Sequence, residues 1–292
     1  MEPGSSQPPL VVVVGETASG KSSLAIDLAR RFDGEIICAD SWTVRREVNI
    51  GTAKPTRKEQ AEIPHHLLDV VGPCEDFTAA VFKRLANRAI SEIHARRKLP
   101  IMVGGTGLYV DSVLFDYSFL PPAEKSQRDE LNSKTIQQLL LLINQRNLSL
   151  EGVDIRNKRR LIRVIESRGA RPARQVLRPN TLIVGIALSR ELLEQRIAER
   201  VNAMLSAGLE KEVKVLAQKY GWDCEALKGI GYQEWKAYLE GAQSMNETKA
   251  RIIKDTLGLA KRQRTWFKRN RSIHWISNAE EAVDLATTFL NK

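Results

Sequence analysis

A complete phosphate-binding loop stands near the start of the sequence. Residues 15–22 read G-E-T-A-S-G-K-S, the pattern G-x-x-x-x-G-K-[S/T], and they follow a run of four valines. The valines predict a buried parallel strand, and the apolar spacing over 22–29 predicts the helix that must follow. In such a loop backbone amides surround phosphate oxygens, the lysine adds charge and the hydroxyl can bind Mg²⁺. We assign phosphate binding to Gly15, Thr17, Ala18, Ser19, Gly20, Lys21 and Ser22, with Ser22 also as the metal ligand.

A carboxylate and a second glycine-rich turn follow two further predicted strands. Residues 35–40 form a short apolar run that ends in Asp40, and the strand predicted at 100–103 runs into Gly104-Gly105-Thr106-Gly107. Ligands of open α/β sheets lie outside the carboxyl ends of the strands. We therefore expect Asp40 to face the same crevice as the phosphate loop.

The order of these elements predicts an α/β fold with a P-loop parallel-sheet core flanked by helices. Apolar periodicity predicts helices over 78–97, 135–143 and 158–166 and strands over 181–188 and 272–276. Ser189 is placed to cap the helix after the fourth strand. No strand is evident between Leu120 and the run at 181. We expect a catalytic core at 1–119 and 179–292, with a small all-helical insertion domain at 120–178.

The positive charge of the chain is concentrated in two segments. The 292 residues carry a formal charge of +10, but residues 156–174 and 251–271 together carry +14 and the rest −4. Segregated basic charge is typical of a nucleic-acid-binding surface, whereas a solvated basic surface is the alternative. The charge distribution favours nucleic acid as a partner.

The three cysteines and the N-terminus bear on the compartment. Cys38, Cys74 and Cys224 are far apart and form no C-x-x-C pair, so we expect unpaired packing residues in a reducing compartment. The valine run is too short for a signal peptide or a membrane span. We expect a cytoplasmic protein with no membrane contact.

Eight collinear motifs identify a family. The chain lacks the guanine-reading N-K-x-D motif and the H-R-D and D-F-G motifs of protein kinases, so another kind of phosphate-using enzyme is needed. It resembles the tRNA dimethylallyltransferases, also called tRNA isopentenyltransferases, from Val11 to about Arg269. The motifs that carry the resemblance are G-E-T-A-S-G-K-S (15–22), A-D-S (39–41), I-G-T-A-K-P (50–55), P-H-H-L-L-D (64–69), V-G-G-T-G-L-Y (103–109), R-V-x-x-M-L-x-x-G-L-x-x-E-V (200–213), G-I-G-Y-Q-E (229–234) and A-K-R-Q-R-T-W-F (260–267).

The resemblance implies transfer of a dimethylallyl group from dimethylallyl diphosphate to N6 of adenosine 37, beside the tRNA anticodon, with Mg²⁺ present and diphosphate released. It also implies tRNA as the partner, and we expect a monomer. The adenine amine is a poor nucleophile, so a carboxylate must take its proton, and Asp40 is the predicted general base. Mg²⁺ ligation and capping of the next turn are the alternative roles for Asp40.

Two further catalytic residues are implied by the resemblance. Thr106 and Arg200 are expected to bind the leaving diphosphate, on which negative charge accumulates in the transition state. The alternatives are a turn-forming cap for Thr106 and a solvated helix face for Arg200. For Arg196, one helical turn earlier, we predict only a position on a solvated helix face.

Contacts with tRNA are expected from the basic segments. The predicted tRNA-binding residues are Lys54, Arg160, Arg163, Lys261, Arg262, Gln263, Arg264 and Lys268. For Lys54, an ordinary loop cation that binds no phosphate is an equally good interpretation. Trp266 and Phe267 are expected to pack internally, and His65-His66 to be structural. The acceptor adenosine must leave its stack, and we expect its pocket between the core and the insertion.

Several positions depart from the family pattern. Glu16 stands where proline is usual, so its carboxylate is expected to point away from the bound phosphates. Thr43 and Arg45 replace a glutamine and a tyrosine after Asp40, which weakens the prediction for adenine recognition. Asn157 replaces an aspartate, and Leu257 replaces an arginine that could contact phosphate.

Two other functions compete with tRNA prenylation. An adenylate isopentenyltransferase would use the same fold and donor with free AMP, ADP or ATP, but a mononucleotide needs no extended basic track. A P-loop RNA-binding protein without transfer activity would keep the basic segments and lose the chemistry. The retention of Asp40 favours an enzyme.

Overall fold

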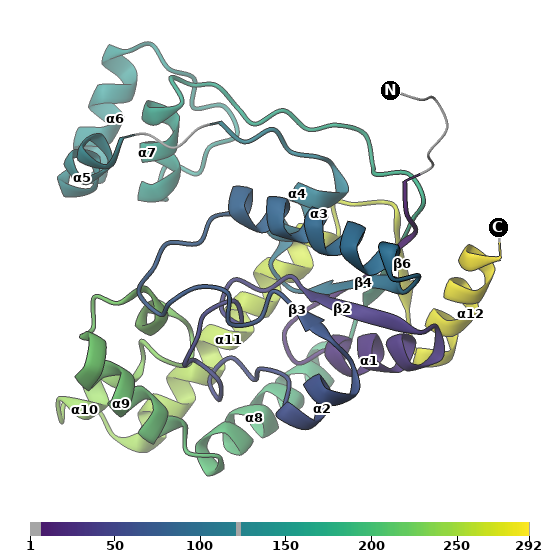
Figure 1. Ribbon diagram of the computed structural model, residues 1–292. Coiled ribbons are helices and arrows are strands. Elements are labelled where there is room, and N and C mark those ends of the chain that lie inside the picture. Colours follow the sequence, from purple (N-terminus) through teal and green to yellow (C-terminus); the bar gives the residue numbers. More distant parts are fainter. Residues whose placement is uncertain (1–6, 121–123, 292) are drawn as a thin grey trace. The chain divides into compact units, whose positions relative to one another are not determined.

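The computed structural model describes residues 7–120 and 124–291 (Figure 1). The chain divides into two compact units, one formed by Met1–Leu114 with Arg178–Lys292 and the other by Phe115–Leu177. The second unit starts a few residues before the insertion expected at 120–178. Its start coincides with the end of helix α4 (Gly107–Leu114).

The first unit is built on one parallel sheet, which confirms the predicted fold class. Within the described residues its six strands lie in the order β3-β2-β4-β1-β5-β6, and each neighbouring pair is parallel. The strands are β1 (Leu10–Gly15), β2 (Gly34–Cys38), β3 (His65–His66), β4 (Leu99–Gly104), β5 (Thr181–Ile186) and β6 (Ile273–Ile276). The carboxyl ends of β2, β4 and β1 therefore meet at one edge of the sheet.

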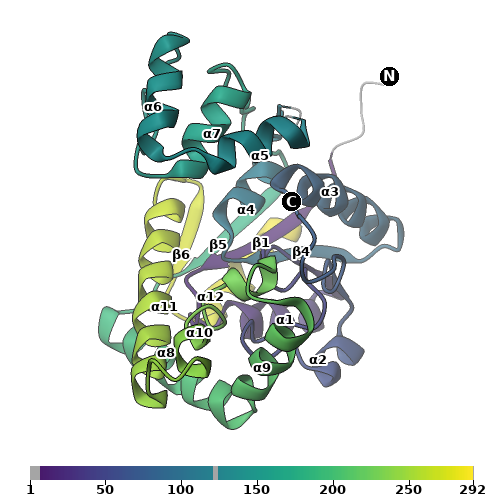
Figure 2. The ribbon, with the colours of Figure 1, turned by 90° about the vertical axis from the view of Figure 1, so that its left-hand side faces the viewer.

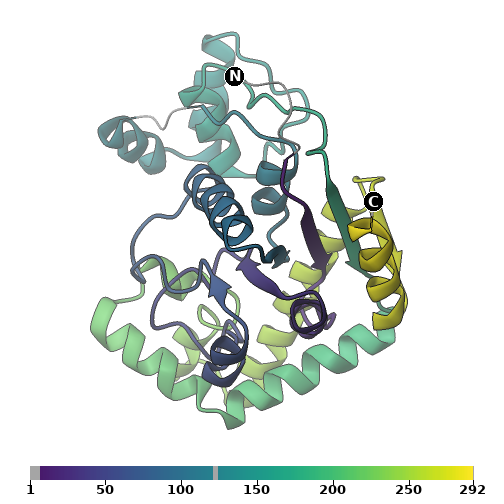
Figure 3. The ribbon, with the colours of Figure 1, turned by 45° about the vertical axis from the view of Figure 1, so that its right-hand side comes forward.

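Helices cover both faces of this sheet. Helices α1 (Lys21–Arg31) and α12 (Ala279–Leu290) pack on the face that carries Val11 and Val13. Figure 3 shows α1 and α12 on one side of the sheet and α3 (Ala79–Ala95) on the other. All four valines of β1 are fully buried, as expected for a central strand covered on both faces.

A second core lies among the helices after β5. Side chains of α8 (Arg190–Ser206), α9 (Leu209–Tyr220), α10 (Trp235–Leu239) and α11 (Met245–Phe267) pack around the fully buried Trp235, together with the short helix η1 (Glu225–Lys228). Helices α8 and α11 run side by side (Figure 2). The Ser189 hydroxyl accepts from the Leu192 amide, so the predicted cap of α8 is confirmed.

The second unit has its own core. Helices α5 (Lys125–Ser133), α6 (Ile136–Gln145) and α7 (Lys158–Glu166) pack around Leu139, Leu161 and Ile165. The helices predicted at 135–143 and 158–166 are confirmed. Helix α5 was not predicted, because its sequence KSQRDELNS offers only one large apolar residue. Helix α2 (Arg57–Glu62), strand β3 and helix α12 were also not predicted.

The cysteine prediction was partly wrong. Cys74 and Cys224 form a disulfide with a Cα–Cα distance of 4.6 Å across a sequence separation of 150. The fold brings them together where the Ala226 amide donates to the Pro73 carbonyl at 3.0 Å. Cys38 is a free buried thiol, and burial raises its pKa. Of the helices in the described part of the chain, none has the length and apolar character of a membrane span.

Candidate active site

The phosphate loop joins β1 to α1 as predicted. Gly20 lies in the left-handed region with φ of 94°, a conformation that an L side chain rarely adopts, and α1 starts at the next residue. Ser22 is exposed in the first turn of α1. The Ser19 hydroxyl is buried and has no hydrogen-bond partner among the described residues. The loop therefore presents a helix N-terminus and two serine hydroxyls.

Lys21 is held close to the other charged groups of the site. Its ammonium donates to the Glu16 carbonyl at 3.1 Å. Burial and, secondly, the charge of Arg200 lower the pKa of Lys21 to about 8, against the opposing effects of Asp40 and Glu16. The structure thus brings Lys21, Asp40 and Arg200 into one electrostatic environment.

The charge of Glu16 is balanced by a cation from α11. Its side chain is buried and forms an ion pair with Arg264 of α11, in which Arg264 Nη2 lies 2.8 Å from Glu16 Oε2. Arg264 also donates to the Leu188 carbonyl at 2.9 Å. The expectation that this carboxylate points away from the phosphates fits this pairing, although the partner was not foreseen.

Gln263 links the two glycine-rich turns. Its Oε1 accepts from the Thr17 amide at 2.8 Å, and its Nε2 donates to the Gly105 carbonyl at 3.1 Å. The side chain is buried, so the structure places Gln263 inside the site and away from the surface where a tRNA contact was predicted. The amide holds the phosphate loop against the turn that carries Thr106.

Asp40 and Thr106 lie at the ends of the adjacent strands β2 and β4. Asp40 Oδ1 accepts from the amides of Trp42 and Thr43 at 2.8 and 3.2 Å. Its Oδ2 accepts no hydrogen bond from any residue that the structure describes, so one oxygen caps the turn and the other is available to a ligand. Thr106 Oγ1 accepts from the Ser41 amide at 3.1 Å, which ties the two strand ends together.

Two arginines of α8 reach the loops at this edge. Arg200 Nη2 donates to the Thr52 carbonyl at 3.3 Å, and burial lowers the pKa of Arg200, whereas Asp40 partly restores it. Arg196 Nη1 donates to the Ser19 carbonyl of the phosphate loop at 3.2 Å. The interpretation of Arg196 as a solvated residue was therefore wrong. Its side chain lies on the loop because Arg196 and Arg200 share one face of the helix.

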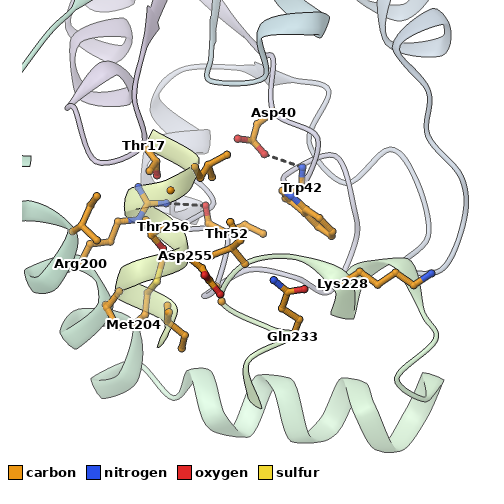
Figure 4. Close-up of a pocket in the computed structure, with 18 of the residues that line it drawn as sticks. Thr17, Asp40, Trp42, Thr52, Arg200, Met204, Lys228, Gln233, Asp255 and Thr256 are labelled. Carbon is orange, nitrogen blue, oxygen red and sulfur yellow. Dashed lines mark hydrogen bonds between the residues drawn. The ribbon is translucent and has the colours of Figure 1, made fainter. Parts of the chain in front are cut away.

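A cavity of about 540 Å³ lies beside these groups. Figure 4 shows Asp40 and the Trp42 ring on one side of it, with Arg200 and Met204 on the other. All of its lining residues belong to the unit that contains the sheet, whereas the sequence led us to expect a pocket between core and insertion. The cavity that Asp40 lines is thus formed within one unit.

The predicted tRNA contacts fall into two groups. Lys261, Arg262 and Lys268 are exposed on and just after α11, and Arg160 is exposed at the start of α7. The other cations have protein partners. Lys54 donates to Arg45 O, Asn49 Oδ1 and Asp69 Oδ1, and Arg163 donates to Leu120 O and Glu166 Oε2.

The remaining aromatic and histidine residues have internal partners. Trp266 Nε1 donates to Asp111 Oδ2 at 2.9 Å, and Phe267 is buried. The ring nitrogens of His65 and His66 lie 2.7 Å from the Ile63 carbonyl and 2.6 Å from Glu35 Oε2. The rings and imidazoles therefore contribute to the fold, as expected.

Sequence reasoning included Glu212 in a family motif but gave no role to this residue, which fixes a loop of the cavity wall. Its carboxylate accepts from the amides of Asn49, Ile50 and Gly51 and from the Tyr232 hydroxyl. This cap fixes the loop whose Thr52 carbonyl holds Arg200. The role of Glu212 could not be read from its own segment, because its backbone partners lie about 160 residues earlier in the chain.

Comparisons with known proteins point to one family. The family model for IPP transferase matches residues 43–270. The tRNA dimethylallyltransferase of Pediococcus pentosaceus is 41% identical, with 94% of each chain covered, and that of Anoxybacillus flavithermus is 38% identical over 94% of this chain and 92% of its own length.

Solved structures give the same similarity. A tRNA isopentenylpyrophosphate transferase from Bacillus halodurans matches with a TM-score of 0.74 and 34% identity, covering 97% of this chain and 95% of its own. A eukaryotic dimethylallyltransferase described as acting on tRNA matches with a TM-score of 0.82 and 25% identity over 97% of this chain and 80% of its own.

Proposed function

The chain belongs to the IPP transferase family, and from that premise we propose that it is a tRNA dimethylallyltransferase. The reaction is transfer of a dimethylallyl group from dimethylallyl diphosphate to N6 of adenosine 37 in tRNA. The observation that carries the proposal is that Asp40 and Arg200 line one cavity beside the phosphate loop and that both act electrostatically on Lys21 of that loop. A base for the acceptor and cations for the leaving group are therefore present together.

The phosphate loop would hold the diphosphate of the donor. Loop amides, the Lys21 ammonium and the buried Ser19 hydroxyl are donors suited to its oxygens. Arg200 and the Thr106 hydroxyl would add further contacts to the diphosphate. Because negative charge accumulates on the diphosphate as the bond to carbon breaks, donors fixed before the reaction lower the barrier.

Asp40 would act as the general base. The N6 lone pair forms a bond to the first carbon of the dimethylallyl group while the bond from that carbon to the diphosphate oxygen breaks. The proton lost from N6 passes to Asp40 Oδ2, the oxygen that does not cap the turn. Two backbone amides on Oδ1 fix the carboxylate for this transfer.

The residues present fit Mg²⁺. Mg²⁺ prefers oxygen ligands and is commonly bound by one or two protein groups together with phosphate oxygens and water. The exposed Ser22 hydroxyl at the start of α1 is such a ligand. Ser22 would hold the ion, which when bound neutralises part of the diphosphate charge.

The exposed cations would bind the tRNA backbone. Lys261, Arg262 and Lys268 form a basic track on and just after α11, and Arg160 adds a charge on α7. Arg264 and Gln263 would instead act by holding the phosphate loop, and Lys54 and Arg163 have protein partners in the absence of RNA. A monomer located in the cytoplasm remains the prediction from sequence.

A labelling experiment tests the proposal against its alternatives. The protein is incubated with radiolabelled dimethylallyl diphosphate and either unmodified tRNA or AMP. We expect label in tRNA alone. Label in AMP alone would identify an adenylate isopentenyltransferase, and tight tRNA binding without label would identify an inactive RNA-binding protein.

Asp40→Asn tests the base. We expect the transfer rate to fall about 10²- to 10⁴-fold with tRNA affinity unchanged. Asp284→Asn, the same change on the exposed face of α12, is the matched control. Near-normal turnover of Asp40→Asn would disprove the assignment.

A further inference from the structure

Trp42 places an aromatic ring beside the predicted base. Its indole lines the cavity that Asp40 and Arg200 also line (Figure 4). The Trp42 backbone amide donates to Asp40 Oδ1 at 2.8 Å, so ring and carboxylate belong to one tight turn. Among the described residues that line this cavity, Trp42 is the one aromatic residue.

The ring is held firmly from behind. A Cβ atom at Gly229 would lie 3.0 Å from Cε3 and Cζ3 of the indole, so the ring packs closely against the backbone at this glycine. The Arg45 guanidinium lies 5.7 Å from the ring centroid, within the range of a cation–π contact. The Trp42 ring is therefore pre-oriented.

Arg45 itself is fixed by the fold. Its Nη1 donates to the carbonyls of Pro73 and Glu75 at 3.1 and 2.6 Å, and its side chain is buried. Thr43 is buried as well. The two departures from the family pattern thus lie behind the cavity wall, and the side chain that this segment presents to the cavity is Trp42.

The two sides of the cavity differ in chemistry. Ile197, Val201 and Met204 lie on α8 next to Arg200 and offer aliphatic surface. That side suits the five-carbon chain of the donor, whose diphosphate needs the arginine. The side formed by Asp40 and Trp42 offers a carboxylate and a planar ring, which suits an aromatic base with an exocyclic amine.

We propose that Trp42 is the stacking platform for the acceptor adenine, a role that rests on the proposed function. A base taken out of an RNA stack loses its neighbours, and aromatic side chains replace them in RNA-binding sites. Stacking on the indole would hold the adenine in the plane from which N6 reaches Asp40. Trp42 thereby determines acceptor binding and leaves donor binding untouched.

Steady-state kinetics of Trp42→Leu and Trp42→Phe test this role, with an anticodon stem–loop as acceptor. We expect Trp42→Leu to lower kcat/KM for the stem–loop about 10- to 100-fold, the effect of losing one base–aromatic stack. Trp42→Phe keeps a ring and should stay within about fivefold of the parent. KM for dimethylallyl diphosphate should be unchanged in both variants, which also shows that the site is folded.

Trp275→Leu is the matched control. Trp275 is 40% exposed on strand β6 and does not line the cavity, so its kinetics should equal those of the parent. An unchanged kcat/KM for the stem–loop in Trp42→Leu would overturn the stacking role, and so would a rise confined to KM for the donor. If the parent protein itself transferred no label to RNA, the proposed function would fail instead.

Discussion

Arg264 neutralises the carboxylate that this chain carries inside its phosphate loop. The side chain of Glu16 is 4% exposed and that of Arg264 is 32% exposed. Arg264→Met keeps the aliphatic stem and removes the cation, which leaves a buried carboxylate without a partner. Breaking a buried ion pair in this way costs about 3–5 kcal/mol. Because water reaches a third of Arg264, we expect the lower end, a loss of about 3 kcal/mol in the free energy of unfolding.

A double-mutant cycle separates the charge pair from simple packing. Glu16→Gln should cost about 1 kcal/mol, since the partly exposed arginine left behind is solvated. The double variant Glu16→Gln/Arg264→Met buries no unpaired charge and should lose about 2 kcal/mol in total. It would then be more stable than Arg264→Met alone, with a coupling free energy of about 2 kcal/mol.

Urea unfolding followed by circular dichroism measures these values. Arg251→Met is the control, because its ion pair with Asp255 spans 4.0 Å between side chains that are 55% and 35% exposed, and should change stability by less than about 1 kcal/mol. Additive losses in the cycle, with coupling below about 0.5 kcal/mol, would refute the reasoning. In that case Arg264 would stabilise the loop through its bond to the Leu188 carbonyl.

Three further predictions follow from the site and the fold. Because the pKa of Lys21 is lowered to about 8, its ammonium loses its proton as the pH rises through that value, so kcat/KM for the donor should fall above about pH 8. Lys21→Arg should remove this limb of the pH profile, and a flat parent profile up to pH 10 would contradict the charge role. Alkylation in denaturant without reductant should label one thiol, Cys38, and after reduction all three; three labelled thiols from the start would exclude the Cys74–Cys224 disulfide. By restricting the unfolded chain, a disulfide that closes so long a loop contributes about 5 kcal/mol to the free energy of unfolding. Reduction of the disulfide should therefore lower the midpoint of urea unfolding. The triple change Lys261→Glu/Arg262→Glu/Lys268→Glu should weaken tRNA binding and reduce its salt dependence, whereas the control Lys214→Glu on exposed α9 should not. If the control weakened tRNA binding as much as the triple change, the basic track on α11 would not be part of the tRNA interface.

The parts of the site that follow directly from the sheet were predictable from sequence. The phosphate loop is a local motif, and Asp40 and Thr106 follow short apolar runs that form neighbouring parallel strands. Since the carboxyl ends of parallel strands share one edge, their proximity needed no knowledge of side-chain packing. The helices at 135–143 and 158–166 were likewise predicted from their own periodicity.

Contacts between distant segments could not be predicted in the same way. Arg196 reaches Ser19 across 177 residues, and Gln263 reaches Thr17 across 246. Both side chains are common on solvated helix faces, so residue type and spacing carried no signal for their partners. The disulfide was missed for the same reason, because only the fold brings the loop at Cys74 against the segment at Cys224.

These long-range contacts explain how a phosphate loop can carry Glu16 at the position where the family pattern has proline. A carboxylate in a phosphate loop opposes an anionic ligand unless a cation cancels it at close range, since the interaction weakens with distance and solvent screening. Arg264 supplies that cation from α11, and its neighbour Gln263 fixes the amide of Thr17 on the same loop. Helix α11 therefore both neutralises and positions the loop. A change in the packing of α11 would therefore disturb the loop at both Glu16 and Thr17.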